Sequence, residues 1–579
     1  MQKSEFSLRL LAFKKILKEQ KIDFFLLPNS DEFFCEYLPE SQKRVQYLTG
    51  FGGSNATIIF SQEKSYFFTD GRYVLQAKNE LDLNEFEIFN IAKKPVLTWL
   101  QENLSKSKNL AFDAKLVSLN FAKFCQKISL NLVFLNENLV DKIWTNQPKP
   151  KNSPVFFCNK KLTGIDSSTK RKLILQNLDS DAMIITRPEN LCWLLNIRAA
   201  DVEFTPLLLA YAILFKNGEI DLFVDEKRFL PSDLKNLSKV NFIQANCFDL
   251  RIGVLRKKIS KIQIDAASTN YWLYECLVKN NFEIIAKTDP IELTKSQKNS
   301  AEISGAIKAH ELDGLALTKF LLWLEKSVEN GEEIDEISAA KKLLEFRQQN
   351  SAFLYPSFNS ISAFASNGAV IHYCATPKTN KKISGNSLYL IDSGGQYFAN
   401  QANDSNDNFC GTTDVTRTIA IGKPSAEMIE NFTRVLKGHI ALARVKFPIG
   451  TTGAQLDALA RFHLWQAGLD FDHGTGHGVG SFLSVHEGPC GISKRVHQEL
   501  LEGMILSNEP GFYLDGEYGI RIENLMLVKK INDKFLGFKT LTLAPIDERL
   551  IDFKMLTYPE KKWLKDYHQE ISQKFAGKI

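Results

Sequence analysis

Four acidic side chains are predicted to lie at or beside strand ends within one stretch of the chain. The run SLYLIDSGG is an apolar strand that stops at Asp392, and GMILSNEPGFY is a second one that stops at Glu509. In the alternating runs GTTDVTRTIAIG and YGIRIENLML, Asp414 and Glu523 lie on the polar faces, Glu523 together with Arg521. A buried carboxylate without a cation is costly, and only one of these runs offers an arginine beside its acid. We therefore expect bound cations.

A pair of histidines accompanies these acids. His473 and His477 stand in FDHGTGHGVG, where the glycines disfavour a helix and the glutamate of an HExxH zinc site is absent. We interpret the glycines as room for the backbone to approach metal and substrate closely. Two divalent cations would formally balance four carboxylates. An oxygen-rich ligand set with one imidazole suits Mn²⁺, with Fe²⁺, Co²⁺ or Zn²⁺ as substitutes.

The elements that would position these residues include one long helix and a repeated module. Apolar residues recur at helical intervals from Ala301 to about Val328, which predicts a helix there. Upstream, IDFFLLPNSDEFFCEYL matches SDAMIITRPENLCWLL, and YFFTDGRY matches DLFVDEKRF, at an offset of about 155–160 residues. We expect two copies of one α/β module. Neither copy contains a histidine, so the chemistry is expected downstream of both.

Two seams divide the chain. A proline-rich run at 145–154 and the run KTDPIELTKSQKN at 287–299 interrupt the apolar pattern. The expected domains are 1–148, 149–290 and 291–553, followed by a tail at 554–579.

The composition favours a globular enzyme or binding protein. Of 579 residues, 44% are hydrophobic and 24% are charged, and the net charge of +5 is spread along the chain, which argues against a nucleic-acid partner. No run approaches the roughly 20 apolar residues that span a bilayer. The amphipathic start lacks the features of a secretory signal. Nine scattered cysteines without a CxxC argue against a disulfide framework and a cysteine zinc site. We expect a cytoplasmic protein without membrane contact.

Longer motifs surround the candidate residues. They are TGFGGSNATIIF, FFTDGRYVLQA, WLLNIRAADVEFTPLLLAYAIL, IDSGGQY, GTTDVTRT, VLKGHIAL, HGTGHGVGSFLSVHEGPCGIS, NEPGFY and GIRIENL. Over nearly its whole length the chain resembles the creatinase-like metallohydrolases of the pita-bread fold, and among them the long, three-domain, cytosolic Xaa-Pro aminopeptidases (aminopeptidase P). The resemblance implies an α/β fold class with two creatinase-N-like modules, a C-terminal pita-bread catalytic domain and a helical tail.

The resemblance also implies a ligand set for two divalent ions per subunit, with Mn²⁺ favoured. In chain order the ligands are Asp392, Asp414, His477, Glu509 and Glu523. Asp392 would chelate one ion, His477 and Glu509 the other, and Asp414 and Glu523 would bridge both. A hydroxide between the ions would attack the peptide bond, and Glu509 would move its proton. The implied activity is removal of the N-terminal residue from short peptides with proline in the second position.

Five further residues are expected around the substrate. By resemblance His372, which we place at a strand end, shuttles a proton or contacts substrate, and His486 hydrogen-bonds substrate. His473 would help to form the proline pocket. Arg521 would orient a bridging carboxylate or a substrate carbonyl, and Tyr513 would line the proline wall. Structural hydrogen bonding or packing is the alternative for each. Solvated side chains are expected for the remaining histidines, His310, His439, His463, His497 and His568.

One departure from the family pattern and several alternatives stay open. Twenty-one residues separate Asp392 from Asp414, as though a polar loop of about eleven residues lengthened an exposed hairpin. Asp404 or Asp407 is the less favoured second ligand. A prolidase that cleaves only Xaa-Pro dipeptides is the alternative enzyme, and a non-catalytic pita-bread protein that binds peptides is the alternative from another class. Family precedent implies a homodimer.

Overall fold

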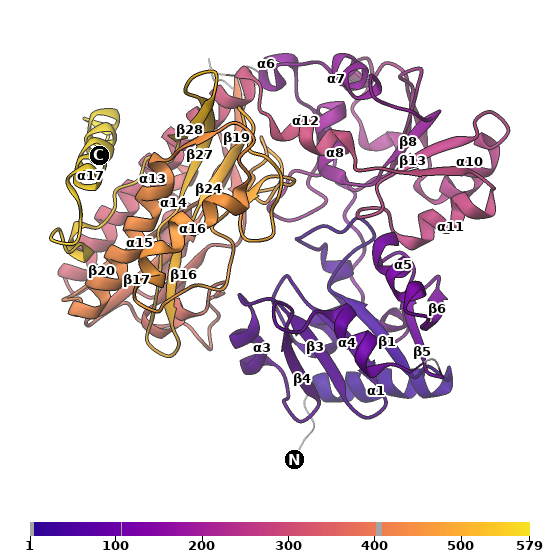
Figure 1. The fold of residues 1–579 in the computed structure, drawn as a ribbon, viewed down its shortest axis with the longest axis horizontal. Coiled ribbons are helices and arrows are strands. Elements are labelled where there is room, and N and C mark those ends of the chain that lie inside the picture. The colour runs from indigo at the N-terminus through magenta and orange to yellow at the C-terminus, as the bar shows by residue number, and fades with distance from the viewer. Residues whose placement is uncertain (1–4, 106, 401–407) are drawn as a thin grey trace. The chain divides into compact units, whose positions relative to one another are not determined.

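The protein, seen here in a computed structural model, consists of two compact units. The structure describes residues 5–105, 107–400 and 408–579. Unit 1 comprises Met1–Cys158 and Ile165–Ile291, and unit 2 comprises Asn159–Gly164 and Glu292–Ile579. Figure 1 shows unit 1 in indigo to magenta and most of unit 2 in orange to yellow.

Unit 1 contains two six-stranded sheets of the same topology. The first has the order β4-β3-β2-β1-β5-β6 and the second β12-β11-β10-β8-β13-β14. The strands of the first are β1 (Phe24–Pro28), β2 (Thr57–Ser61), β3 (Ser65–Thr69), β4 (Phe86–Asn90), β5 (Asn109–Asp113) and β6 (Asn131–Leu135). Those of the second are β8 (Ala182–Ile185), β10 (Ala212–Phe215), β11 (Ile220–Phe223), β12 (Val240–Ile243), β13 (Lys261–Ile264) and β14 (Glu283–Ala286).

The pairing directions confirm that the two sheets are copies of one module. In the first sheet, β1 pairs antiparallel with β2 and parallel with β5. In the second sheet, β8 pairs in the same way, antiparallel with β10 and parallel with β13. The helices are α1 (Glu5–Glu19), α2 (Arg44–Thr49), α3 (Val74–Glu80), α4 (Val96–Asn103), α5 (Leu119–Lys127), α7 (Ser167–Leu175), α8 (Pro188–Leu195), α9 (Pro231–Leu234), α10 (Phe248–Leu255) and α11 (Tyr271–Lys279).

Unit 2 begins with the predicted long helix. After α12 (Pro290–Ser296), α13 spans Ser300–Glu329, and a capping box between Asn299 and Glu302 satisfies its first backbone N–H groups. Its buried face packs against β19 and α14. The remaining helices are α6 (Lys160–Thr163), α14 (Glu336–Gln348), α15 (Ala426–Arg444), α16 (Gly453–Trp465) and α17 (Tyr558–Phe575).

Short antiparallel sheets form the rest of unit 2. The larger ones have the orders β15-β18-β19, β16-β17-β20 and β21-β28-β27-β24, and β22-β23 and β25-β26 pair separately. Their strands are β15 (Phe353–Pro356), β16 (Ile361–Phe364), β17 (Ser387–Ser393), β18 (Gly395–Ala399), β19 (Phe409–Thr412), β20 (Val415–Ile421), β21 (Lys446–Pro448), β22 (Gly476–His477), β23 (Gly491–Ile492), β24 (Ile505–Asn508), β25 (Gly511–Leu514), β26 (Tyr518–Arg521), β27 (Asn524–Lys530) and β28 (Phe535–Thr540).

The long spacing between Asp392 and Asp414 does not disturb the strand register. β18 pairs with β19 from Gln396↔Thr412 to Ala399↔Phe409, and Asp392 lies opposite Thr416. The expected exposed loop, with Asp404 and Asp407, falls on residues 401–407, which lie outside the described residues. Asp414 therefore occupies a fixed position immediately before β20.

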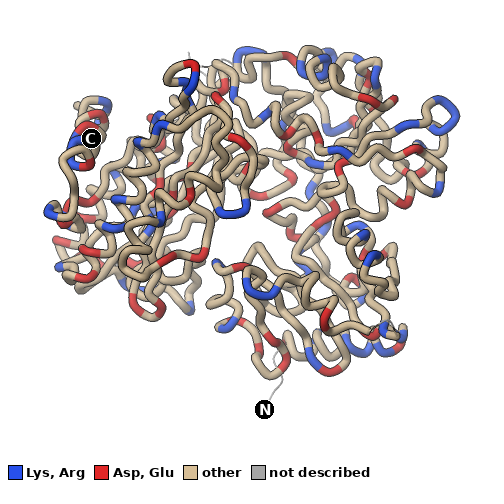
Figure 2. Tube along the Cα trace, viewed as in Figure 1, with Lys and Arg blue, Asp and Glu red and all other residues tan. Residues whose placement is uncertain are grey.

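Charged residues of both signs are mixed along the chain. Figure 2 shows Lys and Arg interspersed with Asp and Glu along both units. Within the described residues, every helix is too short or too polar to cross a bilayer.

Two glycines let backbone carbonyls approach α13 closely. A Cβ atom at Gly305 would lie 2.2 Å from the carbonyl oxygen of Cys410, and one at Gly314 would lie 2.1 Å from that of Leu543. Alanine normally stabilises a helix interior by about 1 kcal/mol relative to glycine, so these glycines serve packing rather than helix formation.

We predict that Gly305→Ala lowers the free energy of unfolding of unit 2 by about 1–3 kcal/mol, because the added methyl must push β19 away from α13. The matched control is Gly253→Ala in α10, where the nearest atom to the new Cβ is a side-chain oxygen of Asn280 at 3.3 Å. Calorimetric unfolding of both variants checks this. Equal stability of Gly305→Ala and the unmodified protein would contradict the packing argument.

Candidate metal centre

The structure brings together the five predicted ligand residues from strand ends and from breaks between strands. Asp392 is the penultimate residue of β17, Asp414 joins β19 to β20, and His477 ends β22. Glu509 follows β24 directly. Glu523 lies between β26 and β27, because the run predicted as one strand from Tyr518 to Leu527 is two strands interrupted at this carboxylate.

Ligand atoms of these residues lie within 4.8 Å of one another in three overlapping groups. The groups are Asp392 with Asp414 and Glu523, Asp414 with His477 and His486, and His477 with Glu509 and Glu523. Two ions that share Asp414 and Glu523, with His477 on one of them, would account for this overlap. Asp404 and Asp407 lie outside the described residues.

His477 presents one ring nitrogen to the acids. Its Nδ1 lies 3.0 Å from the carbonyl oxygen of Gly478, which can only accept a hydrogen bond, so Nδ1 carries the proton. The other ring nitrogen, Nε2, lies 3.4 Å from Asp414 Oδ2 and 3.7 Å from Glu509 Oε1. A backbone carbonyl on the far nitrogen is the arrangement that fixes a metal-binding imidazole.

Burial dominates the electrostatics of the four carboxyl groups. It raises the pKa of Asp392 to about 6 and that of Asp414 to about 7, and it also raises the pKa of Glu509 and of Glu523. Oδ1 of Asp392 and Oε1 of Glu523 are buried without a hydrogen-bond partner among the described residues. Orphaned anionic oxygens that converge on one point fit divalent cations.

Arg521 connects the acids to the aromatic wall of the site. It donates from Nη2 to Asp392 Oδ2 at 2.7 Å and from Nη1 to Tyr513 Oη at 2.7 Å. Tyr513 Oη in turn lies 2.9 Å from His473 Nε2. The predicted residues Arg521, Tyr513 and His473 are thus brought together with Asp392 in one continuous chain of contacts.

The structure brings His486 to the cluster and places His372 differently from our prediction. The His486 ring meets the His477 ring edge to face, with centroids 4.2 Å apart. His372 does not end a strand: it lies in a turn after the short helix η5 (Ala365–Ala369) and outside the three groups of ligand atoms. The carboxylate of Glu336 holds this segment by accepting hydrogen bonds from the side chains of Asn367 and Tyr373.

Sequence reasoning assigned no role to Thr416. Its hydroxyl donates to Glu523 Oε2 at 2.8 Å and receives Arg521 Nε at 3.2 Å, so it fixes one oxygen of a predicted bridging ligand. The alternation in GTTDVTRT places Thr416 on the same strand face as Asp414. That shared face was the sequence signal that could have identified Thr416 as a site residue.

Two of the glycines around the histidines have a packing role. A Cβ atom at Gly476 would lie 2.0 Å from the carbonyl oxygen of Ser507, and one at Gly478 would lie 2.2 Å from that of Glu487. They allow neighbouring backbone segments to approach closely.

Two histidines predicted to be solvated are buried, so that prediction is wrong for them. His310 lies in α13 with Nδ1 2.7 Å from the carbonyl oxygen of Ala306. His439 in α15 is fully buried, and burial lowers its pKa to about 3. Both stand on the packed faces of their helices, which spacing alone did not show. His497 is exposed, and His463 and His568 are partly buried.

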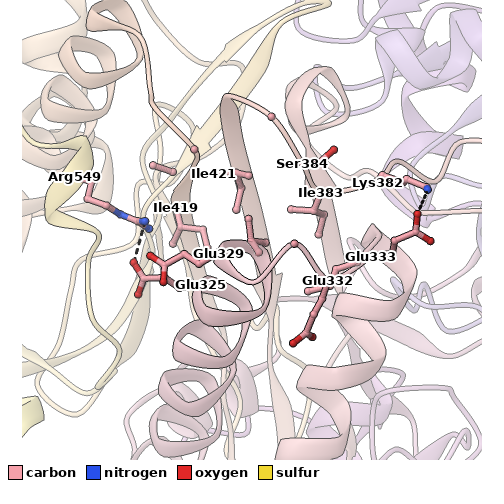
Figure 3. A pocket seen from close by; sticks show the side chains of 16 residues that line it. Glu325, Glu329, Glu332, Glu333, Lys382, Ile383, Ser384, Ile419, Ile421 and Arg549 are labelled. Carbon is pink, nitrogen blue, oxygen red and sulfur yellow. Dashed lines mark hydrogen bonds and ion pairs between the residues drawn. The ribbon is translucent and has the colours of Figure 1, made fainter.

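A separate cavity of about 620 Å³ lies at the opposite ends of β17 and β20 from the acids. Figure 3 shows its walls, which carry the ion pairs Arg549–Glu325 and Lys382–Glu333. The described residues that line the cavity include no histidine. The two ion pairs neutralise the charges of the four residues that form them. The converging acids and histidines remain the candidate centre.

Comparison with known families matches each part of the chain. Residues 305–530 match metallopeptidase family M24, and residues 534–579 match the C-terminal region of that peptidase. Residues 9–139 and 146–302 each match a creatinase/prolidase N-terminal domain.

Whole-chain relatives and solved structures agree. Xaa-Pro aminopeptidase 1 of Dictyostelium discoideum is 37% identical, covering 100% of this chain and 94% of the relative. A probable Xaa-Pro aminopeptidase P of Laccaria bicolor is also 37% identical, covering 98% and 90%. The X-prolyl aminopeptidase of Caenorhabditis elegans, a cytosolic enzyme with a di-nuclear active site, aligns at TM-score 0.92 and 33% identity over 99% of this chain and 96% of that one. The prolidase of Pyrococcus horikoshii aligns at TM-score 0.51 and 27% identity, covering 65% of this chain and 99% of its own. The chain belongs to the Xaa-Pro aminopeptidases of metallopeptidase family M24.

Proposed function

We propose that the protein is a metal-dependent aminopeptidase that removes the N-terminal residue from short peptides with proline in the second position. The observation that carries this proposal is the convergence on His477 of four carboxylates, three of them buried and one partly buried, of which two oxygens have no hydrogen-bond partner among the described residues. The activity named for the full-length relatives supports the same reaction.

Five residues are proposed as ligands of two divalent ions, with Mn²⁺ favoured by the predominance of oxygen donors. They are Asp392, Asp414, His477, Glu509 and Glu523. When bound, two divalent ions supply Lewis acidity for activating water and for polarising a carbonyl.

The protein's own groups are proposed to move protons and hold the peptide. Glu509 carries a carboxyl whose pKa burial raises, which suits it to take a proton from water and deliver it to the leaving nitrogen. His486 lies beside His477, where it can hydrogen-bond the scissile carbonyl. His372 is proposed as a further proton or substrate contact on the neighbouring turn.

Shape is proposed to select proline. A prolyl residue offers no N–H and has a fixed φ, so a site must recognise its ring rather than its backbone donor. His473 and Tyr513 present adjoining rings, and Phe471 packs against His473 with centroids 4.7 Å apart. Arg521 fixes Tyr513 and Asp392 in one geometry, which would hold the ring pocket in register with the metal ligands.

We further infer a cytoplasmic homodimer with domains at 1–148, 149–290 and 291–553 and a tail at 554–579. The cytosolic C. elegans neighbour supports the location, and the two repeated sheets support the first boundary. The interspersed charges of Figure 2 favour peptides over nucleic acid, and membrane contact is not part of the proposal.

The length of the peptides that the protein cleaves distinguishes the proposed aminopeptidase from a prolidase and from a non-catalytic binding protein. We expect the Mn²⁺-loaded protein to cleave Xaa-Pro-Yaa tripeptides, releasing free Xaa, and to cleave them faster than Xaa-Pro dipeptides. Amino-acid analysis of the products measures this, with Xaa-Ala-Yaa peptides as the substrate control. Turnover of dipeptides alone would instead identify a prolidase, and no turnover with any divalent ion would indicate a binding protein.

The raised carboxyl pKa values predict how pH affects stability. Asp392 and Asp414, with pKa values of about 6 and about 7, bind more protons in the folded metal-free protein than their unfolded values near 3.9 allow. Their contribution to stability is therefore present below about pH 4 and is lost as pH rises through about 7. Bound cations remove that loss, so the gain in unfolding temperature on adding Mn²⁺ is expected to grow from pH 5 to pH 7.5.

Thermal unfolding with and without Mn²⁺ at both pH values tests this expectation. In Asp392→Asn, which deletes one of the buried charges, the pH dependence of the gain should shrink. An Mn²⁺ gain that is the same at both pH values would show that the carboxyl groups do not bind the ion.

A further inference from the structure

Arg417 is a fully buried arginine directly behind the candidate metal centre. Its guanidinium is 1% exposed and uses all its faces: Nη1 donates to the carbonyl oxygens of Thr416 at 2.8 Å and Glu523 at 2.7 Å. Nη2 donates to the carbonyl oxygen of Ala544 at 2.7 Å, to Asn524 Oδ1 at 2.8 Å and to Tyr567 Oη at 2.9 Å. Among the described residues, every hydrogen-bond acceptor of Arg417 is a carbonyl, amide or hydroxyl oxygen rather than a carboxylate.

These contacts hold both ends of one candidate ligand. Arg417 binds the backbone carbonyl of Glu523, while the preceding residue, Thr416, donates to the Glu523 carboxylate at 2.8 Å. The backbone N–H of Glu523 also donates to the carbonyl of Thr416 at 3.2 Å. The break between β26 and β27 is thus clamped onto β20 at the residue that carries the carboxylate.

The same network reaches a second candidate ligand. Because Arg417 can only donate, Asn524 must turn its oxygen toward Arg417 and its Nδ2 toward His439 Nε2, 3.1 Å away. Asn508, which precedes Glu509, donates to the carbonyl oxygen of His439 at 2.9 Å. His439, buried and neutral, therefore bridges the residues that adjoin Glu523 and Glu509.

The outer end of this network lies on the C-terminal helix α17. Tyr567 is 5% exposed and lies on the apolar face of α17, which packs into the core of unit 2 through Leu564, Ile571 and Phe575. Its hydroxyl receives Arg417 Nη2 and donates onward to the carbonyl oxygen of Ala544 at 3.0 Å. The Tyr567 hydroxyl is one of three acceptors around Arg417 Nη2, with Asn524 Oδ1 and the carbonyl oxygen of Ala544, so its removal deletes one of the contacts that fix this end of the guanidinium.

We propose that Tyr567 is a positioning residue for the metal centre: through Arg417 it sets the place of Glu523, so that α17 belongs to the site although it offers no ligand. This inference rests on the proposed metal-binding function. Groups that orient metal ligands typically change metal affinity 10–100-fold when they are removed, because a ligand must be held to within about 0.5 Å.

The test is the Mn²⁺ affinity of the chelator-treated full-length protein, measured by calorimetric titration. Tyr567→Phe keeps the ring and its stacking on Trp563, whose centroid lies 5.1 Å away, and deletes only the hydroxyl. We expect its dissociation constant for Mn²⁺ to rise about 10-fold or more. The electron paramagnetic resonance spectrum of bound Mn²⁺, which reports the ligand geometry, should change as well.

Leu564→Ala is the matched control, since it weakens the packing of the same helix face and leaves the polar chain intact. It should lower the unfolding temperature while leaving the Mn²⁺ dissociation constant and spectrum unchanged. Equal Mn²⁺ affinities of Tyr567→Phe and the unmodified protein, or equal losses in both variants, would overturn the positioning role alone. Failure of the unmodified protein to bind Mn²⁺ would instead overturn the proposed metal centre.

Discussion

Repulsion among four converging carboxylates is the constraint on which unit 2 depends. Asp392, Asp414 and Glu523 are buried and Glu509 is partly buried, and burial together with mutual repulsion pushes the pKa values of this cluster upward. Arg521 offsets one charge, through Asp392, and the rest require cations. The folded chain therefore stores an electrostatic cost at one point, and that cost becomes binding free energy when divalent ions arrive.

Holding such a cluster together requires rigid supports on every side. Each acid stands at a strand end or strand break, so that the paired strands beside it fix the position of its backbone. Behind them Thr416 and Arg417 clamp Glu523, and Arg521 ties Asp392 to Tyr513. Tyr513 and Arg521 therefore stay in fixed relation to the acids. The strands fix where the acidic residues lie, and short polar contacts fix how their side chains are oriented.

Sequence patterns predicted the local features and missed those that depend on distant partners. Apolar runs that stop at acids placed Asp392 and Glu509 at strand ends, and the constant offset between the two halves of unit 1 predicted the repeated sheet. We predicted a strand end at His372 and missed the turn there. The residue that holds this turn, Glu336, lies far away in sequence on α14 and therefore left no local signal. The burial of His439 was missed for the same reason, since Asn508 and Asn524 are far from it in sequence.

The pairing of β18 with β19 makes the position of Asp414 independent of the number of residues that connect the two strands. Ala399 pairs with Phe409 at its far end, while Gln396 pairs with Thr412 two residues before Asp414. The register of the strands, rather than the number of residues that join them, sets where Asp414 stands. The connection between these strands is accordingly a natural place to graft a foreign peptide, such as an epitope or a fluorescent reporter, without altering the distance from Asp392 to its neighbouring acid.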